Sequence, residues 1–285
     1  MTYVLAVLAA VAYGANWVLQ QHEAAEAPTK LQLHPVRLIE HLLHRPLWLV
    51  GLLALIVGSV VQEVALAYGS LPVVEAVLVL ALVFALVLNS RLSQQPVSPP
   101  RWLGAALVCA GLATFLLAGD PTPGRGSGAD SHWFFVLIVL GGLAALLCVV
   151  AWRLPGSGRA AMCSTAAALM FGLSDALSKA VFNRDGSQVH LLIFWQLYGA
   201  LGSAILAVAL SQIAYNAAPL AVSLPFLAVG EPLAGLFAGV VALKVHFATT
   251  ISALAWEAVA AFAVVVGSMA MGWGRGLHLH RPGPA

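Results

Sequence analysis

The chain has 285 residues, of which 61% are hydrophobic and only 8% are charged, and its mean hydropathy is +0.94. A soluble domain carries about 25% charged residues, so the composition indicates a membrane protein with several spans. The net charge is +2 and the 13 basic residues are scattered, which excludes a nucleic-acid-binding surface. Cys109, Cys148 and Cys163 lie in or near apolar runs without a CxxC pair, and they predict neither a disulfide framework nor a metal site.

The first apolar run extends from about Tyr3 to Leu19 and has no basic residues before it. A cleavable signal peptide begins with basic residues, so this run is expected to stay as the first span. In residues 33–45, charged side chains fall on one side of a helical wheel and apolar side chains on the other. This pattern predicts an amphipathic helix that lies in the membrane interface. The histidines of this segment and Glu40 are spaced too loosely to favour a metal site over a solvated helix face.

Eight more apolar segments follow along the chain. They are expected to span the membrane at about 46–68, 71–88, 102–118, 132–152, 160–182, 191–213, 216–247 and 251–273. A proline-rich loop precedes the fourth span, and a linker rich in glycine, serine and proline precedes the fifth. The predicted fold class is therefore all-α, a polytopic membrane bundle of about nine transmembrane helices.

Short motifs recur in the same order in the two halves of the chain. The pair YG at 13–14 matches FG at 171–172, an offset of 158, and LAYGSLP at 66–72 matches IAYNAAP at 213–219, an offset of 147. The fourth and ninth spans are both rich in small residues. The shared order predicts that the first four spans and the last four are repeats of one unit.

The repeats divide the chain into four parts. They are a first transmembrane repeat (1–118), a linker with the joining fifth span (119–159), a second repeat (160–273) and a tail (274–285). Because one span joins the repeats, the second is expected to cross the membrane in the opposite sense. Nine basic residues on the side of the C-terminus, against four on the other, place the C-terminus in the cytoplasm and the N-terminus outside the plasma membrane.

Three segments carry a family resemblance: LAYGSLPVVEAVLVLALVFALVLNSRL, WLGAALVCAGLATFLL and PLAVSLPFLAVGEPLAGLFAGV. They resemble the drug/metabolite transporter superfamily (EamA-like), and within it the nine-span branch that includes NIPA-like proteins. The resemblance covers nearly the whole chain and implies a secondary transporter of two inverted repeats, without naming a substrate. Family members usually have Gly-Glu-Arg where this chain has Asn89-Ser90-Arg91 and Lys244-Val245-His246. A mechanism that depends on those glutamates is therefore not implied here.

The stretch 216–247 combines three prolines with an acidic residue in an apolar segment: Pro219, Pro225, Pro232 and Glu231. A carboxylate at the centre of a membrane helix costs roughly 2.5–3.5 kcal/mol, so it usually has a function. A proline leaves backbone carbonyls without a donor, which a cavity, water or a neighbouring helix must supply. The stretch is expected to be a helix broken at these prolines, formed of one piece or two, that exposes Glu231 to a central cavity.

Other charged residues also lie within apolar spans, namely Glu63, Glu75, Asp175, Lys179 and Glu257. Glu63 and Glu231 lie nearest the middle of their spans and are expected to couple transport to protons or cations. Asp175 and Lys179 are four residues apart on one helical face and can neutralise each other. Alternatively, Lys179 meets an anionic group of the substrate or a glutamate of another helix.

Asn16, Tyr68 and Tyr215 are the polar and aromatic residues selected as candidate substrate contacts. The two tyrosines occupy matching places in the repeated motifs, and aromatic faces suit an amphipathic substrate. Most such residues in membrane proteins are instead interfacial anchors or form hydrogen bonds between helices.

The sequence therefore predicts a secondary transporter that moves a small metabolite or drug-like solute by alternating access, coupled to protons or cations. One alternative is a NIPA-like Mg²⁺ transporter, which clustered carboxylates favour and Lys179 opposes. The other is a membrane scaffold or accessory subunit without transport activity. No enzyme activity, bound metal or cofactor is expected. The expected partners are the lipid bilayer and the small-molecule or ion substrate, with a homodimer left open.

Overall fold

The computed structural model describes residues 1–28, 30–31, 34–68, 74, 77–94, 96–119, 130–184, 194–246 and 250–272. These residues form helices and no strand. The helices are α1 (Thr2–Glu26), α2 (Pro35–Leu43), α3 (Pro46–Tyr68), α5 (Ala81–Ser93), α6 (Pro99–Gly119), α7 (Asp130–Arg153), α8 (Gly156–Arg184), α9 (Trp195–Ala217), α10 (Leu220–Leu243) and α11 (Ile251–Gly272).

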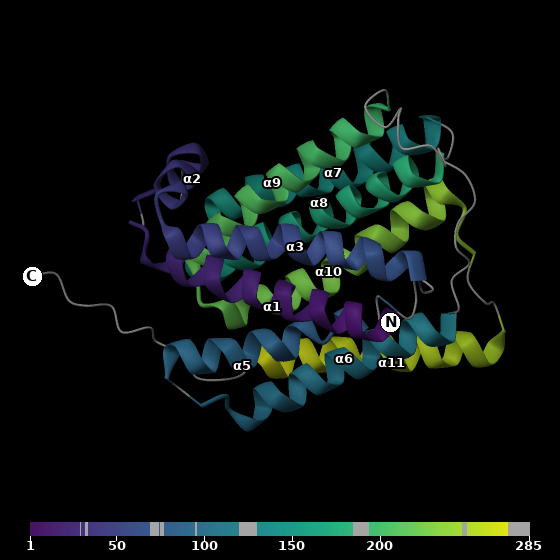
Figure 1. Ribbon diagram of the computed structural model, residues 1–285, viewed down its shortest axis with the longest axis horizontal. Helices are drawn as coiled ribbons and strands as arrows, with labels where there is room; N and C mark the ends of the chain where they lie inside the picture. Colours follow the sequence, from purple (N-terminus) through teal and green to yellow (C-terminus); the bar gives the residue numbers. More distant parts are fainter. Residues whose placement is uncertain are drawn as a thin grey trace, which may run out of the picture.

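Two helices, α1 and α8, are each the centre of a packed group, and α6 and α11 form a further pair (Figure 1). α1 packs against α3 and α5, and α8 packs against α7, α9 and α10. α1 also touches α9 and α10, and α6 lies alongside α11, so these contacts join the first half of the chain to the second. In the most apolar 18-residue stretch of α8, 67% is buried, which is the largest share among the described long apolar helices. α8 is therefore the centre of its group.

Seven of the described helices are long and apolar enough to cross a membrane, namely α1, α3, α6, α7, α8, α9 and α10. Two shorter apolar helices, α5 and the segment Ala255–Met271 of α11, follow the same order along the chain as the predicted third and ninth spans. The chain is therefore a multi-pass helical membrane protein. The linker residues 120–129 and the tail 274–285 lie outside the described residues.

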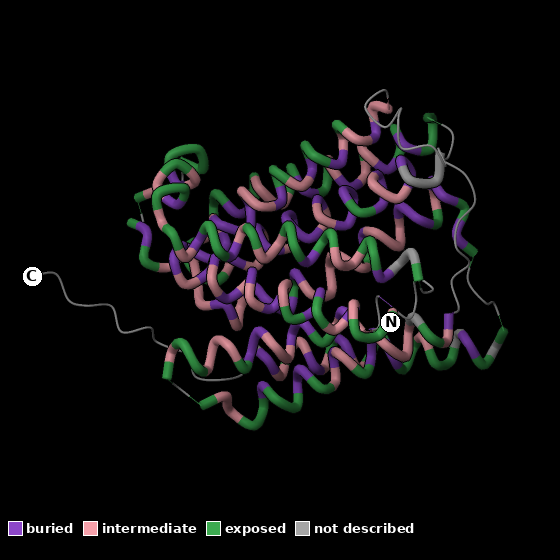
Figure 2. The backbone as a smooth tube through the Cα atoms, viewed as in Figure 1, coloured by how far each residue is buried: buried purple, intermediate pink, exposed green. Residues whose placement is uncertain are grey.

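The distribution of polar and apolar side chains is the one expected in lipid, and Figure 2 marks which positions along the backbone are buried or exposed. Large apolar side chains are exposed, among them Leu103, Phe134, Ile138, Ile205 and Phe262. Several amide and hydroxyl side chains are buried inside it, among them Asn16, Gln20, Gln196, Gln212 and Ser223. Lipid tails solvate apolar side chains well and polar ones poorly, so polar groups gather in the interior.

The predicted helix breaks at Pro225 and Pro232 are wrong, whereas Pro219 does lie at a helix boundary. α10 is one continuous helix with Pro225 and Pro232 inside it, and Pro219 is its N-cap residue. Each interior proline removes one N–H group and leaves the carbonyl four residues earlier, here that of Ala221 or Ala228, without its helical donor. The helix continues through both positions because α10 packs against α8 along its length and Pro225 is buried in the interior. Neighbouring helices make interior prolines tolerable in membrane helices.

The predicted interfacial helix is observed as α2, but it is shorter than 33–45 and packs differently. Leu38 and Leu42 are buried in the core of the bundle, where α2 contacts α3 and α9. Among the large apolar side chains of α2, those of Val36 and Leu43 are exposed. Part of the apolar face of α2 is therefore buried against the protein, where α2 contacts α3 and α9.

Close backbone contacts at glycines join several helix pairs. A Cβ atom added to Gly104 of α6 would lie 2.5 Å from the carbonyl oxygen of Gly267 in α11, and one added to Gly267 would lie 2.7 Å from that of Gly104. A Cβ on Gly14 of α1 would lie 2.8 Å from an α5 carbonyl oxygen, and one on Gly172 of α8 would lie 2.4 Å from that of Glu231 in α10. Glycine thus sets how closely these helices approach.

The substitution Gly104→Ala is expected to destabilise the protein by about 1–3 kcal/mol, because the new methyl group overlaps the backbone of α11. Thermal unfolding of the purified protein in detergent measures the effect. Gly141→Ala in α7 is the matched control, since nothing lies within 4 Å of its added Cβ. Equal unfolding temperatures for the two variants would contradict the α6–α11 packing.

Candidate functional site

Charged side chains of α3 and α8 lie together toward one end of the bundle. Glu63 of α3 is near enough to Lys179 of α8 for an electrostatic interaction between carboxylate and ammonium groups. Asp175 lies one turn before Lys179 on α8, so both project from the same face of that helix. Glu63, Asp175 and Lys179 are called the charged cluster below. It brings together one helix from each half of the chain.

The carboxylates of the charged cluster are not buried in the core. Glu63 and Asp175 are exposed and Lys179 is half-buried, although all three lie on apolar helices that are long enough to span a membrane. A charge that faces hydrocarbon is costly, so such residues face the bundle interior, a water-filled cavity or a partner charge. The charged cluster therefore needs water or bound polar groups within the membrane.

A hydrogen bond from α1 holds the turn of α3 that carries Glu63. The hydroxyl of Tyr13 donates to Oε1 of Gln62 and lies 3.3 Å from the hydroxyl oxygen of Ser59. Gln62 directly precedes Glu63 in the chain. The orientation of Glu63 is thus linked to the packing of α1 against α3.

Glu231 lies near the middle of α10. It follows Leu220, the first residue of α10, by 11 residues, which corresponds to about 16 Å along a helix. Its carbonyl group packs against Gly172 of α8, three residues before Asp175. Its half-buried side chain is near enough to Tyr215 of α9 for an electrostatic interaction. Glu231 and the charged cluster therefore approach the same stretch of α8.

A second polar group lies toward the opposite end of the spans. Gln212 of α9 accepts a hydrogen bond of 2.9 Å from Trp48 Nε1 of α3, and its Nε2 donates to Gln20 Oε1 of α1 at 2.5 Å. All three side chains are buried. Gln20, Trp48 and Gln212 are called the amide network below. Trp48 precedes Glu63 by 15 residues on α3, or about 22 Å, so the two polar groups lie at different depths.

Several buried polar atoms of α1 and of the first turn of α10 have no hydrogen-bond partner. Among the described residues, Nε2 of Gln20, Nε2 of Gln21 and Oδ1 of Asn16 on α1 have no hydrogen-bond partner, and neither has the hydroxyl of Ser223 on α10. A buried polar atom left unsatisfied costs about 1–3 kcal/mol, so water or a ligand is expected to complete its hydrogen bonds. These atoms are therefore expected to bind water or a polar ligand.

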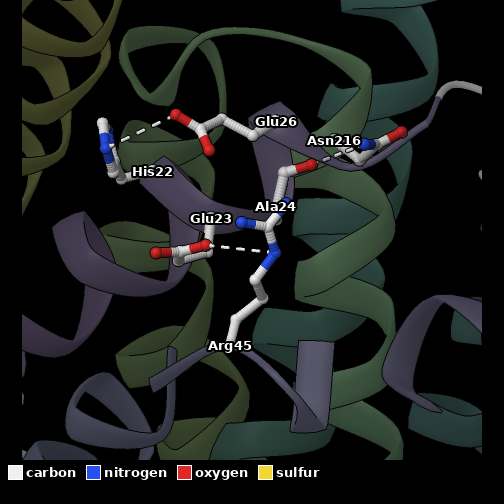
Figure 3. A network of polar contacts seen from close by, with 6 residues as sticks. All are labelled: His22, Glu23, Ala24, Glu26, Arg45 and Asn216. Atoms are coloured by element: carbon white, nitrogen blue, oxygen red, sulfur yellow. Dashed lines mark hydrogen bonds and ion pairs between the residues drawn. The ribbon is translucent and has the colours of Figure 1, made fainter. Parts of the chain in front are cut away.

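Polar contacts also fix the end of α1 next to this network (Figure 3). Asn216 of α9 donates to the carbonyl group of Ala24. It also donates to the carbonyl group of Ala27, at 2.9 Å. The guanidinium Nε of Arg45, just before α3, lies 3.7 Å from Oε2 of Glu23 on α1. These contacts hold α1, α3 and α9 together where the amide network begins.

The remaining predicted residues are less closely grouped. Asn16 and Tyr215 are buried, whereas Tyr68 is 66% exposed at the end of α3, so the matched tyrosines have different surroundings. Glu257 is half-buried on α11, which packs mainly against α6 and not against α3 or α8. Glu75 lies outside the described residues.

The amide network was not selected from the sequence, although one signal for it was present. Asn16 and Gln20 are four residues apart on α1, and Gln212 and Asn216 are four residues apart on α9. Amides at this spacing share one face of a helix, and in an apolar span that face points inward. The part played by Trp48 has no comparable signal in the sequence.

Comparison with known proteins finds a relative of similar length. An uncharacterized protein of Corynebacterium glutamicum is 27% identical over 247 residues, which cover 86% of this chain and 84% of the relative. No protein-family model matches the chain, and no solved structure matches it.

Proposed function

We propose that this protein is a secondary transporter that moves a small organic solute across the plasma membrane by alternating access. The charged cluster carries the proposal, because it places three ionisable side chains from both halves of the chain on membrane-spanning helices. Exposed charges at this depth require hydration, so a water-filled path is expected to reach them. A protein that only anchors or scaffolds partners has no need of such charges.

Polar side chains at three depths form the proposed path. The amide network lies toward one end of α3, Glu231 lies near the middle of α10, and the charged cluster lies toward the other end of α3. The amide network and the charged cluster each contain residues from both halves. Relative movement of the halves would therefore change both groups, as alternating access requires.

The inverted-repeat organisation is supported by equivalent glycine contacts. Gly14 of α1 packs against α5, the third apolar helix of the first half, and Gly172 of α8 packs against α10, the third of the second half. α6 and α11, the last helix of each half, contact each other through reciprocal glycines. Together with the motif resemblance, this pattern favours a drug/metabolite-transporter type of fold, with the N-terminus outside and the C-terminus in the cytoplasm.

In the proposed mechanism, the attraction between Glu63 and Lys179 holds α3 and α8 together and closes one end of the path. Protonation of Glu63, or binding of a cationic group, removes that attraction and opens this end. Glu231 then exchanges a proton or cation in step with the solute. Lys179 repels a divalent cation at this site, which favours an organic solute over Mg²⁺.

The proposal is tested by metabolite and ion profiling of cells that lack or overproduce the protein, followed by uptake into proteoliposomes. The uptake panel comprises the solutes whose levels change and Mg²⁺, each with and without a proton gradient. Accumulation of an organic solute supports the proposal, and accumulation of Mg²⁺ alone supports the cation-transporter alternative. If folded, inserted protein moves none of them, transport is contradicted and a scaffold role is favoured.

A further inference from the structure

α3 is held in the bundle chiefly by one neighbour. In its most apolar 18-residue stretch only 17% is buried, the smallest share among the described long apolar helices. Among the described helices it packs extensively against α1 alone, with a smaller contact to α2 (Figure 1). Glu63 of α3 nevertheless interacts with Lys179 of α8. Because close packing between α3 and α8 does not place Glu63 there, its position depends on how α1 holds α3.

Two glycines of α3 make room for two side chains of α1. A Cβ atom added to Gly51 would lie 2.9 Å from Cγ of Gln20, and one added to Gly58 would lie 3.1 Å from Cε1 of Tyr13. The two glycines are seven residues apart, and so are the two side chains that they receive. Seven residues are close to two helical turns, so each pair lies on one face of its helix. These contacts fix the register of α1 on α3.

The hydroxyl of Tyr13 extends this contact to the next turn of α3. It donates to Oε1 of Gln62, four residues after Gly58, so the ring and the hydroxyl of one side chain touch successive turns of α3. Consecutive residues of a helix point about 100° apart, so Glu63 points to one side when Gln62 is held toward α1. A rotation of α3 about its own axis would therefore break the hydrogen bond of Tyr13 and turn Glu63 away from its present direction.

We propose that Tyr13 is a positioning residue, which sets the rotation of α3 and thereby presents Glu63 to Lys179. The ring of Tyr13 against Gly58 sets the spacing of α1 and α3, and the hydroxyl sets the rotation through Gln62. The positioning itself does not depend on transport. Its effect on uptake rests on the proposed function, in which the attraction between Glu63 and Lys179 closes one end of the path.

Cysteine cross-linking of the full-length protein tests the positioning without any need for transport. The three free cysteines are replaced with Ala, and Glu63→Cys is combined with Lys179→Cys. A short, uncharged bis-thiosulfonate reagent joins the two thiols, and mass spectrometry of the intact protein distinguishes one bridging reagent from two separate ones. Tyr13→Phe keeps the ring and removes the hydroxyl. It is expected to lower the yield of the bridge about two- to tenfold, as for loss of one neutral hydrogen bond.

Gln62→Leu is a second variant, because it removes the acceptor and keeps Tyr13. It is expected to lower the yield by a similar factor, and the double variant is expected to lower it no further, since both changes break the same bond. Tyr3→Phe is the matched control, because Tyr3 is 64% exposed near the start of α1. It is expected to leave the yield unchanged.

The proposal is overturned if the parent pair forms no bridge, if Tyr13→Phe leaves the yield unchanged, or if Gln62→Leu does not share its effect. An equal loss in Tyr3→Phe would also overturn it. With Glu63 and Lys179 intact, Tyr13→Phe is expected to lower uptake by a similar factor. A lower yield of the bridge with normal uptake would support the positioning and contradict a part for the contact between Glu63 and Lys179 in transport.

Discussion

Replacing Glu231 with Gln is expected to reduce gradient-driven uptake to background while the protein stays folded in the membrane. Glutamine keeps the shape of the side chain and leaves the backbone contact between Glu231 and Gly172 unchanged. It removes the only acidic group of α10, near the middle of that span. Without a group that gains and loses charge there, a proton or cation gradient has no means of driving the solute. Uptake into proteoliposomes with an imposed gradient measures the effect.

Two comparisons separate loss of coupling from loss of structure. Glu231→Gln should retain solute exchange when the solute is present on both sides, because exchange needs the path but not the coupling group. Glu257→Gln, on α11, should retain gradient-driven uptake, because Glu257 is half-buried on a helix that packs mainly against α6. Unchanged uptake kinetics in Glu231→Gln would remove Glu231 from the mechanism.

Reversing the charges of the pair that joins α3 to α8 should reveal whether it works as a unit. Glu63→Lys places two cations together, and Lys179→Glu brings a third carboxylate to the charged cluster, so each is expected to lower uptake about tenfold. The double variant restores opposite charges across the same contact and is expected to recover a large part of the activity. Initial uptake rates, corrected for the amount of inserted protein, provide the comparison.

The double variant is decisive because neighbouring residues are coupled and distant ones are not. If the two losses simply multiply, Glu63 and Lys179 act separately and the electrostatic contact has no part in transport. A Glu63→Gln, Lys179→Gln variant serves as a neutral control. It removes attraction and repulsion together. Normal uptake in this variant would indicate that only like-charge repulsion is harmful, and low uptake would indicate that the charges or their attraction are needed.

Composition and hydropathy predicted the helical membrane class, because lipid tolerates few charges and demands long apolar runs. They also predicted the order of the apolar helices along the chain. The charged residues could be selected from the sequence for the same reason: a carboxylate or ammonium group in an apolar helix is conspicuous. The sequence allowed two interpretations of Lys179. It could pair with Asp175 on the same helix, or meet a substrate anion or a glutamate of another helix such as Glu63.

Other features depend on neighbours that a sequence does not reveal. Pro225 and Pro232 were expected to break their helix, but packing against α8 outweighs the loss of two backbone hydrogen bonds. The apolar face of α2 was expected to lie in the membrane interface, but Leu38 and Leu42 are buried in the core of the protein. The spacing of Gln212 and Asn216 indicates a shared helical face, but which side chains bind Gln212 depends on how three helices meet.

The proposed transport requires that water reaches the charged cluster inside the membrane. Labelling of a cysteine at position 175 measures this access most directly. The three free cysteines, Cys109, Cys148 and Cys163, are first replaced with Ala, and Asp175→Cys is compared with Ile138→Cys. Both positions are exposed on long apolar helices, but Ile138 is 72% exposed on the apolar outer face of α7. In intact cells, a membrane-impermeant thiol reagent should label position 175 and leave position 138 unlabelled. Equal resistance of both positions, from either side of the membrane, would contradict a water-filled path at the charged cluster.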